Sequence, residues 1–68
     1  MKNLIKVERA RCNITQAGLA EKVKVARQTI IAIEAGKFIP STLLAFKIAN
    51  GLNCKIDEIF MIEEKDWK

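Results

Sequence analysis

The side chains best suited to recognising another molecule gather on one side of one predicted helix. A helical pattern of apolar residues runs from 26 to 35 and stops at Gly36, a residue that commonly ends helices. Ile30 and Ile33 can point inward together. The outward side then consists of Arg27, Gln28, Ile31 and Ala32. A guanidinium suits the O6 and N7 acceptors of guanine, and a carboxamide suits the N6 and N7 edge of adenine, so this side has the groups that base recognition requires.

Charge is distributed unevenly along the chain. Twelve lysines and arginines against eight aspartates and glutamates give a net charge of +4. Residues 1–55 hold ten basic and three acidic side chains, a net charge of +7, whereas residues 56–68 hold two basic and five acidic ones, a net charge of −3. A basic body with an acidic tail predicts a polyanionic partner for the body, with the tail turned elsewhere.

The sequence offers few residues suited to metal binding or catalysis. The chain has no histidine, and Cys12 and Cys54 lack the paired spacing of a zinc site, so we expect no metal, no cofactor and no small-molecule ligand. A catalytic site needs a base or a nucleophile held in a pocket, which 68 residues without histidine do not favour, so we do not expect an enzyme. The apolar stretches are far shorter than the ~20 residues that cross a bilayer, and the two cysteines indicate reduced thiols. A cytoplasmic protein with no membrane partner is therefore expected.

The length allows one small domain, and the scarcity of glycine and proline favours an all-α fold. Five helices are expected, over residues 3–11, 16–23, 26–35, from the N-cap Ser41 to the segment 51–53, and over 56–60. Asn13 is expected to end the first helix in a left-handed conformation, and Thr15 is expected to cap the second.

Apolar residues predict which sides of these helices are buried. In the first helix they are Leu4, Ile5, Val7 and Ala10. In the fourth helix they are Leu43, Leu44, Phe46, Ile48, Ala49 and Leu52. Phe38 is expected to pack back on the end of the third helix.

The second and third helices have the residue types that a close helix crossing needs. Ala20 is small where the two helices would cross, and Val25 fills the turn between them. The segments TQAGLAEK at 15–22, RQTI at 27–30 and IEAGKF at 33–38, with PS at 40–41 and DEIF at 57–60, resemble the lambda-repressor-like Cro/repressor (XRE-type) helix-turn-helix family. The resemblance covers about residues 3–60 and therefore most of the chain.

The resemblance implies a compact five-helix domain whose second helix crosses the DNA backbone and whose third helix lies in the major groove. It assigns base readout to Arg27, Gln28, Ala32 and Ile31. It assigns phosphate contacts to Gln16, Thr29 and Lys37. The residue types leave alternatives open, because Gln16 is also a good helix-starting residue and the others also suit phosphate contact or plain exposure to solvent.

Two further residues have a structural role in the resemblance, and three depart from its pattern. Arg9 and Glu34 stand where the family often carries a salt bridge between the first helix and the end of the third. Lys24 occupies a turn position that favours glycine, so either the turn differs or Lys24 takes a strained conformation at a cost of about 1 kcal/mol. Ala26 replaces the usual Ser or Thr cap of the third helix, and Gly18 lies inside the second helix, each at a cost of about 1 kcal/mol.

These observations predict a transcriptional regulator that binds double-stranded DNA, a repressor acting as a homodimer on two half-sites roughly 34 Å apart. Residues 1–62 are expected to form the DNA-binding domain and residues 63–68 an acidic tail. The dimer interface is assigned to Phe60, Met61, Ile62 and Trp67, and the alternative is that they cover the monomer's own core. A helical protein-interaction module or an antitoxin-like regulator of the same fold is the alternative function.

Overall fold

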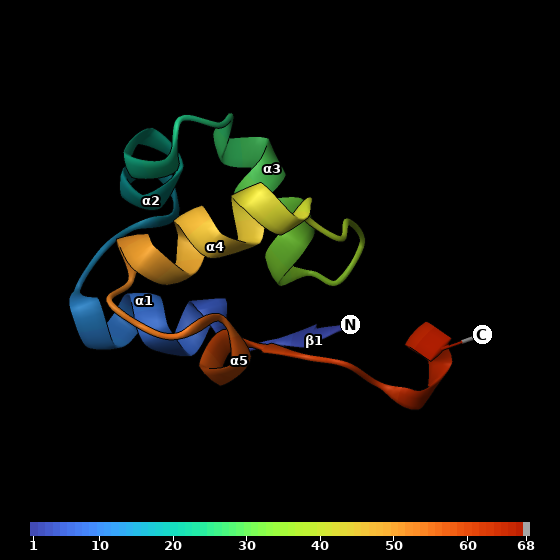
Figure 1. Cartoon of the computed structure of the whole chain (residues 1–68). Helices are drawn as coiled ribbons and strands as arrows, with labels where there is room; N and C mark the ends of the chain where they lie inside the picture. Colours follow the sequence, from blue (N-terminus) through green and yellow to red (C-terminus); the bar gives the residue numbers. More distant parts are fainter. Residues whose placement is uncertain (68) are drawn as a thin grey trace.

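The helix pair α2 and α3 is the most extensively packed part of the molecule. The computed structural model describes residues 1–67. Helix α2 spans Gln16–Val23 and α3 spans Arg27–Glu34, and these two helices share more contacts than any other pair of elements. Helix α4 (Thr42–Gly51) packs on α2 and on α5 (Ile56–Ile59). Figure 1 shows α4 between the α2–α3 pair on one side and α1 (Ile5–Cys12) with α5 on the other.

The helix boundaries follow local capping chemistry. The Thr15 hydroxyl accepts a hydrogen bond from the Gly18 amide at 2.9 Å, and α2 begins at the next residue, Gln16, as predicted. The Ser41 hydroxyl accepts from the Leu44 amide at 3.2 Å and starts α4 in the same way. Ala26 precedes α3 with no side-chain hydrogen bond to its first turn. The side-chain cap predicted to be missing at the start of α3 is therefore absent.

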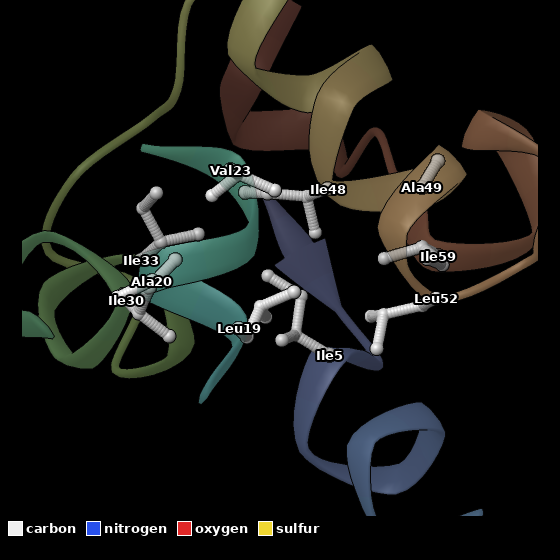
Figure 2. Packing of buried hydrophobic residues seen from close by; sticks show 10 residues of the cluster. All are labelled: Ile5, Leu19, Ala20, Val23, Ile30, Ile33, Ile48, Ala49, Leu52 and Ile59. Carbon is white, nitrogen blue, oxygen red and sulfur yellow. The ribbon is translucent and has the colours of Figure 1, made fainter. Parts of the chain in front are cut away.

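The core is made of branched aliphatic side chains from five helices. Figure 2 shows them converging from α2, α3, α4, α1 and α5 on one interior. Seven side chains are fully buried, namely Ile5, Leu19, Ile30, Ile33, Ile48, Leu52 and Ile59. Each contributes about 1.5–3 kcal/mol by its removal from water. In α3 only Ile30 and Ile33 are buried, so this core fixes which side of the helix faces outward.

The predicted buried faces of two helices were partly wrong. In α4 the side chains of Leu43 and Phe46 are 66% and 54% exposed, whereas Ala45 is buried. The inward side of α4 follows positions 45, 48, 49 and 52, a single helical face, and Leu43 and Phe46 fall outside it. In α1 only Ile5 is buried and Val7 is 57% exposed, because one side of this short helix is enough to cover the core.

Phe38 lies against α3 but is only partly covered there. It lines a hollow with Gln28, Thr29 and Ala32, and 48% of its surface is exposed. The chain turns at Gly36, which has a φ of 76°, and the backbone of Lys37 closes the helix by donating to Ala32 O at 2.9 Å. These main-chain bonds end α3 without help from an aromatic side chain.

A two-stranded ladder joins the two ends of the described chain, and nothing in the residue pattern predicted it. Strand β1 (Lys2–Asn3) pairs antiparallel with β2 (Phe60–Met61), with Lys2 opposite Met61 and Asn3 opposite Phe60. The Asn3 carboxamide donates to Ile33 O at 2.8 Å and accepts from the Ile5 amide at 3.3 Å. Asn3 is thereby held outside α1, which begins at Ile5 and not at residue 3 as predicted.

A short 3₁₀ helix, η1 (Glu64–Trp67), follows β2. Figure 1 places it beyond β1, away from α2 and the start of α3. Among residues 1–67 no helix has both the length and the apolar character that a bilayer crossing needs.

Three non-glycine residues have left-handed backbones, and each ends a helix or turn: Asn13, Lys24 and Asn53. Asparagine tolerates this conformation because its short side chain can bond locally. Lys24, with a φ of 64°, has no such compensation and follows α2 directly. The backbone strain predicted for this turn is therefore present.

Lys24→Gly is expected to raise the free energy of unfolding by about 1 kcal/mol, because glycine adopts a positive φ without a Cβ clash. Urea denaturation followed by circular dichroism measures the change. Glu21→Gly is the matched control, since it places glycine at an exposed position inside α2, where it is expected to destabilise the protein by about 1 kcal/mol. A Lys24→Gly variant less stable than the parent would contradict this account of the turn.

Candidate nucleic-acid interface

The outward side of α3 presents polar and apolar groups next to one another. Arg27 and Gln28 in its first turn are exposed, and Ile31 one turn later is 40% exposed. Thr29 and Ala32 are half-buried. Ile30 and Ile33 on the opposite side are locked in the core, and Figure 2 shows both pointing toward Ala20 and the interior. The helix therefore presents a fixed set of side chains to solvent.

A shallow hollow lies at the middle of this outward side. It is lined by Gln28, Thr29, Ala32 and Phe38. The small Ala32 side chain leaves the space, and the ring of Phe38 forms an apolar wall beside the carboxamide of Gln28. Sequence reasoning assigned Phe38 to the end of α3 and missed its place beside the outward residues, because the direction of the loop after Gly36 cannot be seen in the residue pattern.

The start of α2 forms a second polar surface beside the first. The Thr15 hydroxyl and carbonyl bond the amides of Gly18 and Leu19 at 2.9 Å each. The amides of Gln16 and Ala17 come earlier in the helix, where no helical carbonyl is in reach. A shallow cleft at this point is lined by Arg9, Thr15, Gln16, Ala17 and Arg27. The Arg27 guanidinium and a helix N-terminus at one cleft favour an anion, whereas the Arg9 charge is paired with Glu34.

A hydrogen-bonded network connects the cleft to the end of α3. Arg9 Nε donates to Glu34 Oε2 at 2.6 Å and Arg9 Nη2 donates to Glu34 Oε1 at 3.1 Å, a bidentate pair. The side chains are only 14% and 9% exposed. The Glu34 carboxylate raises the pKa of Arg9 through these hydrogen bonds. Arg9 Nη1 also donates to Ile14 O at 3.2 Å, so the pair holds α1, the approach to α2 and the end of α3 together.

Gln16 is part of the same network, which the sequence did not indicate. Its Nε2 donates to Glu34 Oε1 at 3.2 Å. The carboxamide is therefore oriented by the same carboxylate that holds Arg9. The contact could have been predicted only from a helix-starting glutamine taken together with a buried glutamate, because neither residue type alone indicates the pairing.

The remaining phosphate candidate, Lys37, lies just past the end of α3. Its amide donates to Ala32 O at 2.9 Å, which anchors the backbone, and its side chain is exposed. It therefore follows the same helix whose first turn carries Arg27 and Gln28. The structure brings all the residues assigned to DNA contact onto α3, the start of α2 and the loop after α3.

The apolar residues assigned to a dimer interface divide into two groups. Phe60 and Met61 are half-buried in β2, where Phe60 also packs on the core. Ile62 and Trp67 are 62% and 77% exposed. Ile62 lines an apolar groove together with Ile39, Pro40, Ala45, Ile56 and Phe60. The groove lies between the loop after α3, α4, α5 and β2.

The acidic tail is held at the amino end of the chain. Asp66 Oδ1 accepts from the Met1 amino group at 2.9 Å, and Asp66 Oδ2 accepts from the Glu63 amide at 2.8 Å. The backbone amide of Glu63 and then the amino group hold the pKa of Asp66 below its usual range. No group of three or more acidic or cysteine side chains in residues 1–67 is arranged to hold a metal ion.

A helix with an outward polar side, packed across a second helix whose N-terminus opens on a basic cleft, defines a helix-turn-helix protein. The family model described as helix-turn-helix matches residues 5–59. The chain therefore belongs to the helix-turn-helix family of the Cro/repressor (XRE) type.

Three relatives are similar along almost their whole length. An HTH-type transcriptional regulator of Methanocaldococcus jannaschii is 54% identical over 66 residues, which cover 97% of this chain and 100% of that protein. One from Archaeoglobus fulgidus is 47% identical over 69 residues, covering 100% of this chain and 97% of that protein. The regulator YgzD of Bacillus subtilis is 46% identical over 66 residues, covering 97% and 100%.

Glu34→Ala is expected to lower the free energy of unfolding by about 3 kcal/mol, because it leaves the largely buried Arg9 guanidinium without its partner. Urea denaturation at neutral pH measures the loss. Arg11→Ala is the control, since Arg11 pairs with Glu8 but is 64% exposed, and it is expected to change stability much less. Equal losses in the two variants would contradict the special role of the Arg9–Glu34 pair.

Proposed function

We propose that this protein is a transcriptional repressor that binds operator DNA as a homodimer, with α3 of each subunit in the major groove. The observation that supports this most is the juxtaposition of Arg27 and Gln28, exposed on α3, with the basic cleft at the start of α2. A major groove admits one helix, and the adjacent phosphate then lies beside the helix that precedes it. The network of Arg9, Glu34 and Gln16 supports the proposal because it fixes these two surfaces relative to each other.

Base readout is proposed for the outward side of α3. Arg27 donates to O6 and N7 of a guanine, and Gln28 pairs with N6 and N7 of an adenine. Ala32 and Ile31 offer apolar contact to thymine methyl groups. The hollow at Ala32 and Phe38 supports this role, because a methyl group fits a small space with an apolar wall.

Phosphate contacts are proposed for Gln16, Thr29 and Lys37. Gln16 lies at the helix N-terminus, where backbone amides and the helix dipole attract an anion. Its carboxamide already donates to Glu34, so the second amide hydrogen is available to a phosphate oxygen without loss of that contact. Thr29 follows Gln28 directly and Lys37 lies beyond the end of α3, so both are close in the chain to the proposed base-reading residues, and contacts to phosphate there would set the register of the helix on the backbone.

A homodimer is proposed because one eight-residue helix reads only a few base pairs. Two subunits related by a two-fold axis would read half-sites roughly 34 Å apart. The apolar groove that includes Ile39 and Ile62 is the proposed contact, since both side chains are at least 60% exposed and a two-fold interface buries the same patch of each subunit. Trp67 of η1 adds a further exposed apolar side chain, while Phe60 and Met61 contribute through β2.

The domain boundary and the direction of regulation follow from the same proposal. Residues 1–62 form the DNA-binding domain, and residues 63–68 form a tail whose acidic groups are kept from the phosphates. A dimer seated over two half-sites excludes other proteins from the same stretch of DNA, and this is the basis for proposing a repressor.

Binding to duplex DNA tests the proposal directly. Fluorescence anisotropy of a labelled random duplex is expected to show tight binding at low salt that weakens steeply as salt rises. Selection from a random pool should then yield an operator with two-fold symmetry. Arg27→Ala and Gln28→Ala are expected to weaken operator binding by about 1–3 kcal/mol each and to relax the preference at one base pair.

Matched variants separate base readout from phosphate contact. Lys37→Ala is expected to weaken binding to all duplexes equally and to reduce the slope of log affinity against log salt by about 1. Lys6→Ala removes an exposed lysine of α1 outside the interface and should change the slope little. Absence of binding by the parent at low salt would overturn the proposal that the protein binds DNA and would favour a protein-interaction module.

The homodimer is tested by sedimentation velocity. The parent is expected to sediment as a dimer, and Ile62→Asp is expected to dissociate it, because a charge in an apolar interface loses its water. Val7→Asp is the control, since Val7 is similarly exposed at 57% but lies on α1 outside the groove. A parent that stays monomeric both free and on its operator would contradict the dimer.

A further inference from the structure

The two cysteines of the chain meet although 41 residues separate them. Cys12 is the last residue of α1, and Cys54 lies in the turn between α4 and α5. The Sγ of Cys12 and the Sγ of Cys54 each lie 3.3 Å from the same atom, Leu52 O. Two distances of 3.3 Å to one atom place the sulfurs no more than 6.6 Å apart. Rotation about the side-chain bonds of two cysteines covers separations of this size, because each rotamer change swings a sulfur by about 3 Å.

The two thiols differ in exposure and in partners. Cys12 is exposed, so a small oxidant reaches its sulfur from solvent. Cys54 is half-buried, and its Sγ donates to Glu8 Oε1 at 3.1 Å. Arg11 Nη2 lies 3.3 Å from the same sulfur and favours its thiolate. The hydrogen bond to Glu8 outweighs the arginine and raises the pKa of Cys54, so this thiol keeps its proton until a partner is present.

We propose that Cys12 and Cys54 form an intramolecular disulfide when the protein meets a hydroperoxide. The Cys12 thiol loses its proton, and the thiolate attacks one oxygen of hydrogen peroxide. The O–O bond breaks to give a Cys12 sulfenic acid and hydroxide, which takes up the released proton and becomes water. Cys54 gives up its proton, with Glu8 as the nearest acceptor, and its sulfur attacks the Cys12 sulfur and displaces hydroxide, which becomes the second water. Two thiols are oxidised by two electrons, and one peroxide is reduced to two waters.

The bond would connect two parts of the scaffold and leave the DNA-contacting helices alone. It joins the end of α1 to the turn before α5, and Figure 1 shows these two parts of the chain close together on the side of the molecule below α2 and α3. A crosslink that closes a long loop lowers the entropy of the unfolded chain. Oxidation is therefore expected to stabilise the fold, and the inference is independent of DNA binding.

The test treats the parent protein with hydrogen peroxide, quenches free thiols by alkylation and measures intact mass. The expected result is a monomer that has lost two hydrogen atoms and takes up no alkylating agent, at a rate independent of protein concentration. Tryptic mapping should give one crosslinked peptide pair containing Cys12 and Cys54. The melting temperature of the oxidised protein should rise by about 10 °C and return on reduction with dithiothreitol.

Single variants complete the test. Cys54→Ser is expected to accumulate a Cys12 sulfenic acid that dimedone traps, and Cys12→Ser is expected to react more slowly because its remaining thiol is half-buried. Glu8→Gln removes the acceptor of the Cys54 proton, so the second step should slow and more sulfenic acid should be trapped than in the parent. Disulfide-linked dimers, or oxidation of Cys12 beyond the sulfenic acid with Cys54 still reduced, would overturn the proposal.

Discussion

Three parts of the chain meet at one carboxylate, and the arrangement of the outward surface depends on it. Glu34 accepts two hydrogen bonds from Arg9 of α1 and one from Gln16 at the start of α2. An eight-residue helix such as α3 has too few internal hydrogen bonds to be stable alone, so its direction is set by what it packs on. The apolar side fixes the rotation of α3, and the charged network fixes its far end against the other two helices.

The sequence was sufficient for the features that depend on neighbouring residues. The bounds of α2, the cap at Thr15, the left-handed backbone of Asn13 and the strained turn at Lys24 all follow from short-range sterics and hydrogen bonding. Features that depend on the packing of distant segments were missed. The β1–β2 ladder is two residues long on each side, too short for any alternation to show. The exposure of Leu43 arises because α4 had more apolar residues than its inward face could hold.

At the candidate site too, features that depend on neighbouring residues could be predicted and features that depend on distant packing could not. The outward positions of Arg27 and Gln28 follow from helical periodicity, because Ile30 and Ile33 must be inside. The hydrogen bond from Gln16 and the hollow beside Phe38 depend on where a loop and a helix end lie in space, which one sequence does not specify. Residue chemistry identifies which groups can recognise a partner, and the tertiary contacts decide how those groups are oriented.

The first turn of α3 begins without a side-chain cap. Ala26 offers no side-chain acceptor. Its carbonyl accepts from the Thr29 amide at 3.0 Å, so the amides left to water in the first turn are those of Arg27 and Gln28. Arg27 and Gln28 therefore lie on a turn without a side-chain cap, and ordering their side chains costs conformational entropy when a partner binds. In the proposed homodimer, this uncapped turn would let each subunit adjust to its own half-site, so an imperfect palindrome would be accepted by two identical subunits.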